Sequence, residues 1–317
     1  MSAITRRTAL AQLAAGVAVV AADRGARAAD LQPVRVASAL SDDIAPVVYG
    51  IAAGVFTRLG LDVQLQAANS GAAAAAAVLG GSLDMAKSGT MAIVLGHVRG
   101  VPLTAIWPAA ISTSAAPIAG LIVLRSGGIT TAKDCNGKVF TGASLQDINQ
   151  LAAMAWVDAN GGDSKTMRFV EITSSETIAA LEAGRIDGAT VLNPILQVAL
   201  RTPAVRLLAN PFDTVAKHFC SSTWFTTSDY AAKNSDVVRR FVNGLQEATR
   251  YEYAHQSEMA HYLAPFLHVD EASLAAYPRT TDGLTLTASD YQPVIDLAVR
   301  YGVIPQAFPA AEMLTAY

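Results

Sequence analysis

Apolar positions along this chain recur with two periods, which predicts an α/β fold. Short runs in which apolar and polar residues alternate, such as 61–65, predict half-buried strands. Longer apolar stretches that end at glycine, such as 44–59 and 72–79, predict helices. A regular succession of strand and helix is typical of a mostly parallel sheet covered by helices. The predicted strands of the first hundred residues are 34–37, 61–65 and 83–86, and the predicted helices are 44–59, 72–79 and 90–98.

A similar unit recurs later in the chain. Residues 77–84 match residues 180–187 in their Ala, Gly and Asp positions at an offset of 103 residues, and residues 60–62 and 161–163 recur at nearly the same offset. Two coincidences at one offset predict two similar lobes. The alternative is that helices of any α/β unit tend to end at glycine.

Two further β-type runs predict where the chain passes between the lobes. The run 121–124 is followed by a Ser-Gly-Gly turn, and the run 223–226 precedes a strongly helical stretch, 236–259. We expect the residues from 235 onward to form amphipathic helices that cover lobe one. The predicted lobes are 34–122 plus 224–317 for lobe one and 123–223 for lobe two.

The first 28 residues have the features of an export signal. A basic pair, Arg6-Arg7, precedes an apolar run over 9–22, which at ~14 residues is shorter than the ~20 that a membrane-spanning helix needs. The Ala-Arg-Ala sequence of 26–28 predicts cleavage before Ala29. The twin arginine favours export to the periplasm by the Tat pathway over Sec. No cysteine lies near the cleavage site, which excludes a lipid anchor.

The charge of the chain argues against a nucleic-acid partner. The formal net charge is −3, and removal of residues 1–28, with four arginines and one aspartate, makes it −6. Nucleic-acid binding needs clustered cations, which this sequence does not provide. The two cysteines, Cys135 and Cys220, are expected to be buried free thiols, although their spacing leaves a disulfide open.

The order of several short motifs resembles the nitrate/sulfonate/taurine solute-binding proteins, the NMT1/THI5-like family. The resemblance covers about 34–250 and implies a type II periplasmic-binding fold, in which two α/β lobes close on a ligand in the cleft between them. It implies a monomer without a cofactor that delivers a small sulfonate-, carboxylate- or pyrimidine-like molecule to the membrane permease of an ABC importer. The matching segments are 34–36, 52–56, 59–63, 70–73, 81–84, 120–123, 182–187 and 193–194.

Polar residues follow several predicted strands, and their positions predict the ligand site. Ligands of open α/β sheets bind at the carboxyl ends of strands, where helix N-termini offer free N–H groups. Each of these residues could instead serve only as a helix cap. Together with the family resemblance, they are predicted to bind ligand: Ser38, Ser41, Asp42, Asp43, Ser70, Gly71, Ser88, Gly89 and Thr90 in lobe one, and Ser144, Gln146 and Asn193 in lobe two.

Two of these residues leave the charge of the ligand open. Asp42 and Asp43 stand in the first loop, where a carboxylate that faced the cleft would repel a sulfonate or nitrate. Either both side chains point to solvent, which is usual for Asp in a loop, or the ligand donates hydrogen bonds to them.

An enzyme on the same fold is the main alternative. Relatives that act as desulfinases or pyrimidine synthases use a cysteine or a Cys-rich segment, whereas the first loop here has Ser38, and only Cys220, two residues after His218, could supply a thiolate. The spacing of His255, His261 and His268 does not form a metal-binding pair, and no nucleotide-binding or metalloprotease motif occurs. We therefore predict a binding protein with no catalytic residue, metal or cofactor. A periplasmic ligand sensor has the same features and stays an alternative.

Overall fold

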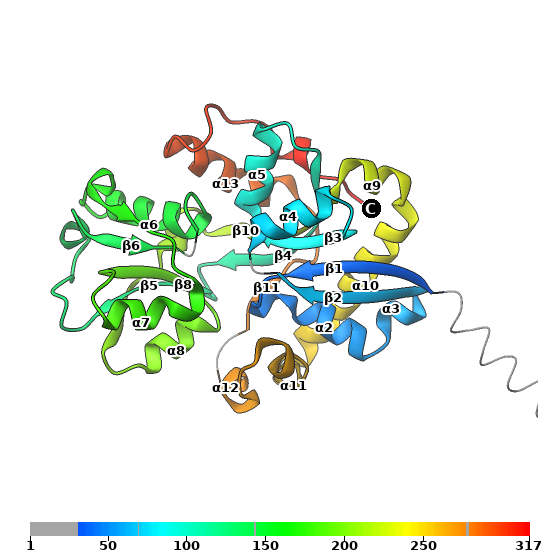
Figure 1. Cartoon of the computed structure of the whole chain (residues 1–317), viewed down its shortest axis with the longest axis horizontal. Helices are drawn as coiled ribbons and strands as arrows, with labels where there is room; N and C mark the ends of the chain where they lie inside the picture. Colours follow the sequence, from blue (N-terminus) through cyan, green and yellow to red (C-terminus); the bar gives the residue numbers. More distant parts are fainter. Residues whose placement is uncertain (1–30, 69, 143, 277–278) are drawn as a thin grey trace, which may run out of the picture.

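Two β-sheets, each covered by helices, form two lobes that lie side by side (Figure 1). The computed structural model describes residues 31–68, 70–142, 144–276 and 279–317. The predicted signal segment, 1–28, lies outside these residues. In the described part of the chain, no helix is long and apolar enough to cross a membrane.

The sheet of lobe one has six strands in the order β11-β4-β10-β3-β1-β2. β1 pairs in parallel with β2 and β3, whereas β10 is antiparallel to β3 and β4. Its apolar residues alternate as predicted, so that Val34 and Val36 lie in the core. The strands are β1 (Gln32–Ser38), β2 (Leu61–Ala67), β3 (Met85–Gly89), β4 (Leu103–Thr113), β10 (His218–Thr227) and β11 (Thr281–Asp282).

The sheet of lobe two has five strands in the order β7-β6-β8-β5-β9. β6 is parallel to β7 and β8, and β5 is antiparallel to β8 and β9. The strands are β5 (Ala119–Leu124), β6 (Val139–Thr141), β7 (Arg168–Phe169), β8 (Gly188–Leu192) and β9 (Val205–Ala209).

Helices cover both sheets, and two of the predicted helices are interrupted. The prediction 44–59 is divided near Gly54, whose positive φ of 68° ends the helical path, and 236–259 is divided at His255. The α-helices are α2 (Ala45–Ala52), α3 (Val55–Arg58), α4 (Gly71–Leu79), α5 (Thr90–Val98), α6 (Ile148–Ala159), α7 (Thr177–Glu182), α8 (Ile195–Arg201), α9 (Ser228–Lys233), α10 (Ser235–Ala254), α11 (Gln256–Leu267), α12 (Glu271–Ala275) and α13 (Ala288–Arg300). Short 3-10 helices are η1 (Asp42–Ile44), η2 (Ala132–Cys135), η3 (Ser164–Thr166), η4 (Ser174–Glu176), η5 (Pro211–Thr214) and η6 (Ala310–Met313).

The repeated sequence motif forms the same contacts in both lobes. In lobe one, the Asp84 carboxylate accepts a hydrogen bond from the backbone N–H of Arg35 in β1 (2.7 Å). In lobe two, Asp187 accepts one from the N–H of Val139 in β6 (2.8 Å). The repeated glycine three residues earlier has positive φ in both units, 73° and 68°. The repeat thus reflects the same strand-helix-strand unit in each lobe.

The chain passes between the sheets earlier than the sequence suggests. β4 leaves the first sheet at Thr113 and β5 begins at Ala119, while β9 ends at Ala209 and β10 begins at His218. The connections are therefore 114–118 and 210–217, whereas the predicted crossings fall at 122/123 and 223/224, inside β5 and β10. A strand that is apolar throughout gives no sign of where its sheet begins.

The lobes pack against each other on one side. A single hydrophobic cluster includes Ile148 of α6 and Phe212 of η5 from lobe two, and Phe219 of β10 and Tyr291 of α13 from lobe one. The hydroxyl of Tyr301, just after α13, donates to Asp158 of α6 (2.9 Å). A movement of one lobe relative to the other must therefore either leave this side in place or break these contacts.

Candidate ligand-binding site

The parallel strands of the two sheets end on edges that face each other. β10 is antiparallel to both β3 and β4, so the carboxyl ends of β1–β3 lie on the edge from which β4 leads to lobe two. β5 enters lobe two at Ala119 and is antiparallel to β8, so the carboxyl ends of β8, β6 and β7 face lobe one. The loops after these strands therefore lie between the lobes, where open α/β sheets bind ligands (Figure 1).

The Asp43 carboxylate lies in a buried network beside β3. It pairs with the ammonium of Lys87 and accepts hydrogen bonds from the hydroxyls of Ser41 (2.6 Å) and Ser222. The Lys87 Nζ also donates to the Ser41 Oγ (2.8 Å). Burial by itself would raise the pKa of Asp43, but Lys87 and the hydroxyl donors hold it below its ordinary value. Asp43 is therefore ionised and neutralised within the chain.

The Asp42 carboxylate belongs to a second buried network. It pairs with the guanidinium of Arg279 and accepts from the backbone N–H of Thr280 (2.8 Å). Arg279 also reaches Glu252 of α10 (3.4 Å), and the Glu252 carboxyl group interacts in turn with that of Asp282. Burial raises the pKa of Asp42, of Glu252 and most strongly of Asp282, whose pKa the neighbouring Glu252 charge raises further. Two carboxyl groups, those of Asp42 and Glu252, thus share one cation, and Asp282 lies against Glu252, which favours a retained proton on the Glu252–Asp282 pair.

Of the two alternatives for Asp42 and Asp43, the one in which both side chains point to solvent is wrong. Their exposed fractions are 1% and 6%, because each carboxylate has a cation from another element as its partner. Lys87 could have been noticed as a single charge inside an apolar strand. Arg279 carried no such signal, since it is 237 residues away from Asp42 in the sequence.

The predicted residues after β2 and β3 come together. A Cβ on Gly71 would lie 2.0 Å from the Ser88 Oγ, so glycine permits the close approach of α4 to β3. Ser70 caps α4 by accepting from the N–H of Ala73 (3.2 Å). Gly89 is exposed at the end of β3, directly before α5. These positions form one continuous surface at the strand ends of lobe one.

Two other predicted hydroxyl groups are used inside the chain. The Ser38 Oγ donates to the carbonyl of Ala39 (2.8 Å), and the Thr90 Oγ1 donates to the carbonyl of Cys220 (2.7 Å). Both residues are buried. Their part in binding a ligand stays a prediction, and their hydroxyls are the least accessible of the predicted set.

The predicted residues of lobe two lie in two loops of the facing edge. Ser144 and Gln146 are exposed in the loop before α6. Asn193 is buried directly after β8, and its N–H donates to the carbonyl of Ile118 in the first connection (3.1 Å). The Asn193 Oδ1 accepts from the Gln197 side chain (3.1 Å). Asn193 therefore lies next to the segment that joins the lobes.

Asp147, which the sequence reading did not select, caps helix α6. Its carboxylate accepts from the backbone N–H of Gln150 (2.8 Å) and from the amide of Asn149 (3.1 Å). Burial raises the pKa of Asp147 to about 7, although these donors lower it. The N-terminus of α6 is thus already occupied by a carboxyl group of the chain.

Neither cysteine has the surroundings of a reactive thiolate. Cys135 and Cys220 are both free and buried, which answers the question of a disulfide between them. Burial raises the pKa of Cys135 to about 11 and that of Cys220 to about 12. The exposed imidazole of His218 pairs with Asp290 (3.3 Å), and it makes no hydrogen bond to the Cys220 thiol among the described residues. Among the described residues, no group of three His, Cys, Asp or Glu is placed to hold a metal ion.

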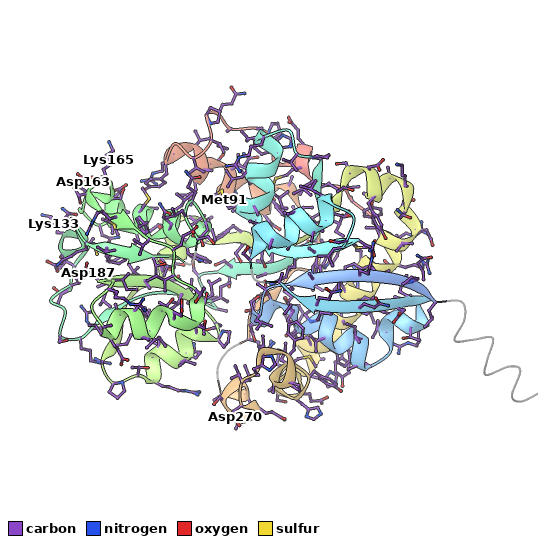
Figure 2. All side chains as sticks on the ribbon, in the orientation of Figure 1. Met91, Lys133, Asp163, Lys165, Asp187 and Asp270 are labelled. Atoms are coloured by element: carbon purple, nitrogen blue, oxygen red, sulfur yellow. The ribbon has the colours of Figure 1, made fainter. Side chains whose placement is uncertain are left out.

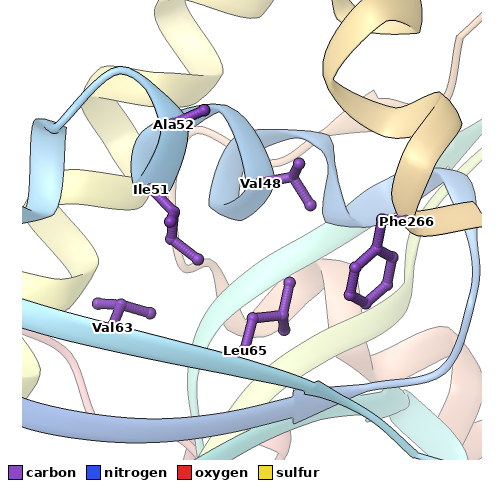
Figure 3. A pocket seen from close by; sticks show the side chains of 6 residues that line it. All are labelled: Val48, Ile51, Ala52, Val63, Leu65 and Phe266. Atoms are coloured by element: carbon purple, nitrogen blue, oxygen red, sulfur yellow. The ribbon is translucent and has the colours of Figure 1, made fainter.

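An apolar cavity of 310 Å³ lies away from the strand ends, between α2, β2 and α11 (Figure 3). Ligand sites combine an apolar wall with a few polar groups that orient the ligand, and this cavity offers no such group. It is therefore a weaker candidate than the facing edges. It is lined by Val48, Ile51, Ala52, Val63, Leu65 and Phe266.

The sequence as a whole identifies the family. A family model described as NMT1/THI5 like matches residues 41–259, from the first loop of lobe one into α11. The chain belongs to the NMT1/THI5-like family. The resemblance inferred from the order of short motifs is thereby confirmed.

Relatives of this NMT1/THI5-like chain include both binding proteins and an enzyme. A protein of Brucella abortus (strain 2308), named as a binding protein without a stated ligand, is 24% identical over 260 residues, 81% of this chain and 78% of the relative. The 4-amino-5-hydroxymethyl-2-methylpyrimidine phosphate synthase of Schizosaccharomyces pombe is 22% identical over 288 residues, 83% of this chain and 79% of the enzyme.

The solved structures define the fold. The periplasmic aliphatic sulphonate binding protein of Escherichia coli superposes with a TM-score of 0.72 and 16% identity, covering 90% of this chain and 92% of that protein. The prediction of a type II periplasmic-binding fold with two α/β lobes is confirmed.

Proposed function

We propose that this chain is a periplasmic solute-binding protein that delivers a small organic molecule to the permease of an ABC importer. The observation that carries the proposal is the pair of facing sheet edges, because loops from both lobes can contact one molecule between them. The fold of its structural neighbours supports a binding role. The ligand classes considered are sulfonate-, carboxylate- and pyrimidine-like molecules.

A thermal-shift screen of the mature protein tests this function. A ligand that binds only the folded state stabilises it by ~2.7 kcal/mol at a hundredfold excess over its Kd. We expect at least one small metabolite to raise the melting temperature, and its binding to reduce the radius of gyration in small-angle scattering as the lobes close. A saturating ligand that leaves the scattering unchanged would contradict closure, and a broad screen without any stabilising compound would contradict the binding function.

An enzyme is the second candidate, because one relative of this chain is named as a pyrimidine phosphate synthase. The surroundings of the thiols do not favour it. The Cys220 thiol is buried, with its pKa raised to about 12, and it lacks a cation that would stabilise a thiolate. Recovery of unaltered ligand after long incubation, measured by mass spectrometry, is the expected result for a binding protein.

A further inference from the structure

We infer that the ligand held between the lobes carries no net negative charge and binds by donating hydrogen bonds from N–H or O–H groups. This inference rests on the proposed function and narrows its ligand class. It would exclude sulfonates and carboxylates and retain uncharged nitrogen-containing molecules.

The loops of the facing edges contain no basic residue. In lobe one the described residues of these loops are 39–43, 68, 70 and 88–90, and in lobe two they are 142, 144–147, 170–176 and 193–194. None of them is Lys, Arg or His. The same loops contain five acidic residues. These are Asp42, Asp43, Asp147, Glu171 and Glu176.

The cations nearest to the lobe-one loops are already neutralised. Lys87 is 3% exposed, and its ammonium is bound by Asp43 and Ser41. Arg279 is 6% exposed and is bound by Asp42 and Glu252. An incoming anion would have to displace a buried carboxylate from its partner, which is unfavourable because it leaves a buried charge without compensation.

Three further lysines lie outside these loops. Figure 2 shows Lys133 and Lys165 at the end of lobe two that is remote from lobe one. In the connections between the lobes the only basic residue is Lys217, which is exposed, and the following His218 pairs with Asp290. A sulfonate at the facing edges would therefore have no free cationic partner among the described side chains of those loops.

The N-termini of two neighbouring helices, α4 and α6, are capped by side chains of the chain itself, whereas α5 begins after Gly89 without a side-chain cap. A helix N-terminus binds an anion through its free N–H groups and its dipole. In α6 the Asp147 carboxylate accepts from the N–H of Gln150, and in α4 the Ser70 hydroxyl accepts from the N–H of Ala73. The site of α6 that would attract an anion thus already holds a carboxyl group.

Free acceptors, in contrast, are present beside the same helix. Asn149 is 8% exposed, and its Nδ2 donates to the carbonyl of Gly142 (3.0 Å). Its Oδ1 has no hydrogen-bond partner among the described residues. The exposed Glu171 carboxylate accepts one hydrogen bond from the described residues, from the N–H of Leu145 (3.1 Å). A buried acceptor without a donor is costly, and a ligand that donates a hydrogen bond to the Asn149 Oδ1 would satisfy it.

Paired probes of equal shape test the charge of the ligand. The mature protein is titrated with methanesulfonate and methanesulfonamide, benzoate and benzamide, and nicotinate and nicotinamide, at constant ionic strength set with sodium chloride. Where a pair gives a saturable rise in melting temperature, we expect the Kd of the amide to be at least about tenfold lower than the Kd of the corresponding acid. Saturable stabilisation by an acid and not by its amide would overturn the inference.

Variants of the buried pair make the test independent of the amide probes. Asp43→Asn frees the Lys87 ammonium, so this variant is expected to gain saturable binding of methanesulfonate that the wild type lacks. The neutral double variant Asp43→Asn/Lys87→Met, which leaves no lone buried charge, is expected to resemble the wild type. Asp229→Asn, at an exposed pair with Lys233, is the matched control. Methanesulfonate binding to the wild type that is lost in the double variant would show that Lys87 is an anion site.

The two possible failures are distinct. If the proposed function is wrong, no compound of any charge stabilises the wild type in the broad screen. If only the inference is wrong, sulfonates or carboxylates stabilise it. The methanesulfonate titrations of the wild type and the Asp43 variants decide the second question even when the screen finds no ligand.

Discussion

Adjacent carboxylates in the first loop pair with cations from different parts of the chain. Asp42 binds Arg279, which stands just before β11, and Asp43 binds Lys87 in β3. A buried charge is stable in a protein only when it is paired and hydrogen-bonded. The two pairs therefore fix the conformation of the loop, and they explain why its acidic residues do not face solvent.

The Cys220 thiol is expected to be unreactive and dispensable. Its burial raises its pKa to about 12, so almost none is thiolate at neutral pH. In the native protein a disulfide reagent such as Ellman's reagent should label it far more slowly than in urea-unfolded protein. Cys220→Ser and Cys220→Ala should change the Kd of a ligand found in the screen by less than about tenfold, or ~1.4 kcal/mol.

Cys135 provides the internal comparison, because it is also free and buried but lies in lobe two. Labelling of single-cysteine variants separates the two thiols. Rapid labelling of native Cys220, or a ligand product that is made by the wild type but not by Cys220→Ala, would support the enzymatic alternative.

At the level of elements, helix α10 is joined to the short edge strand β11 by a carboxyl pair. The carboxyl group of Glu252, near the end of α10, interacts with that of Asp282 in β11, and both residues are buried. The hydroxyl of Tyr253 donates to the carbonyl of Asp282, which adds a second link. Helix α10 is thus linked to the edge of the lobe-one sheet by the Tyr253 hydrogen bond and by a carboxyl pair whose pKa values are raised.

This pair predicts a loss of stability as the pH rises. The pKa values of Glu252 and Asp282 are raised in the folded state, whereas in the unfolded chain they are about 4.3 and 3.9. The stability that the pair contributes is complete below those unfolded values and is lost as the pH rises through the folded ones. Urea unfolding between about pH 5 and 8 should show a steeper decline for the wild type than for Glu252→Gln.

The exposed Glu182→Gln variant removes a carboxylate from α7 without affecting this pair, so it should follow the wild type. Asp43 has a lowered pKa, so its contribution is lost only when the pH falls, and it does not affect this range. Parallel curves for the wild type and Glu252→Gln would mean that the pair holds no proton in the folded protein.

For the molecule as a whole, the two lobes are connected by two short segments and share a hydrophobic cluster on one side. The contacts of α6 with α13, including the Tyr301–Asp158 hydrogen bond, lie on that side. Closure on a ligand would therefore require bending of 114–118 and 210–217 while this cluster is retained. Such hinge movements are typically absorbed by a few loop residues.

Export of the chain is a separate prediction, which concerns residues outside the described part. N-terminal sequencing of protein recovered from the periplasm should begin at Ala29. Replacement of Arg6-Arg7 by Lys-Lys should block export if the Tat pathway is used, and unchanged export would indicate Sec. A product that retains the twin arginine and stays in the membrane fraction would contradict cleavage.

The sequence was sufficient for the parts of the fold that depend on local patterns. Alternating apolar residues located β1 and β2, glycine endings located α4, and the 103-residue repeat anticipated two similar units. Strand ends were a correct guide to which loops lie between the lobes. These features could be predicted because burial on one face and helix termination are encoded within a few consecutive residues.

The electrostatics of the same loops depended on the tertiary structure alone. Asp42 pairs with Arg279, and Glu252 interacts with Asp282, although the sequence separation of these residues gives no hint of contact. Asp147 caps α6 with a carboxyl group that would usually face water. The sequence by itself determined that acidic residues stand at the site. Only the folded chain decided that their charges are neutralised from within, because a side chain's pKa and its availability to a ligand are set by partners that the sheet and its C-terminal helices bring together.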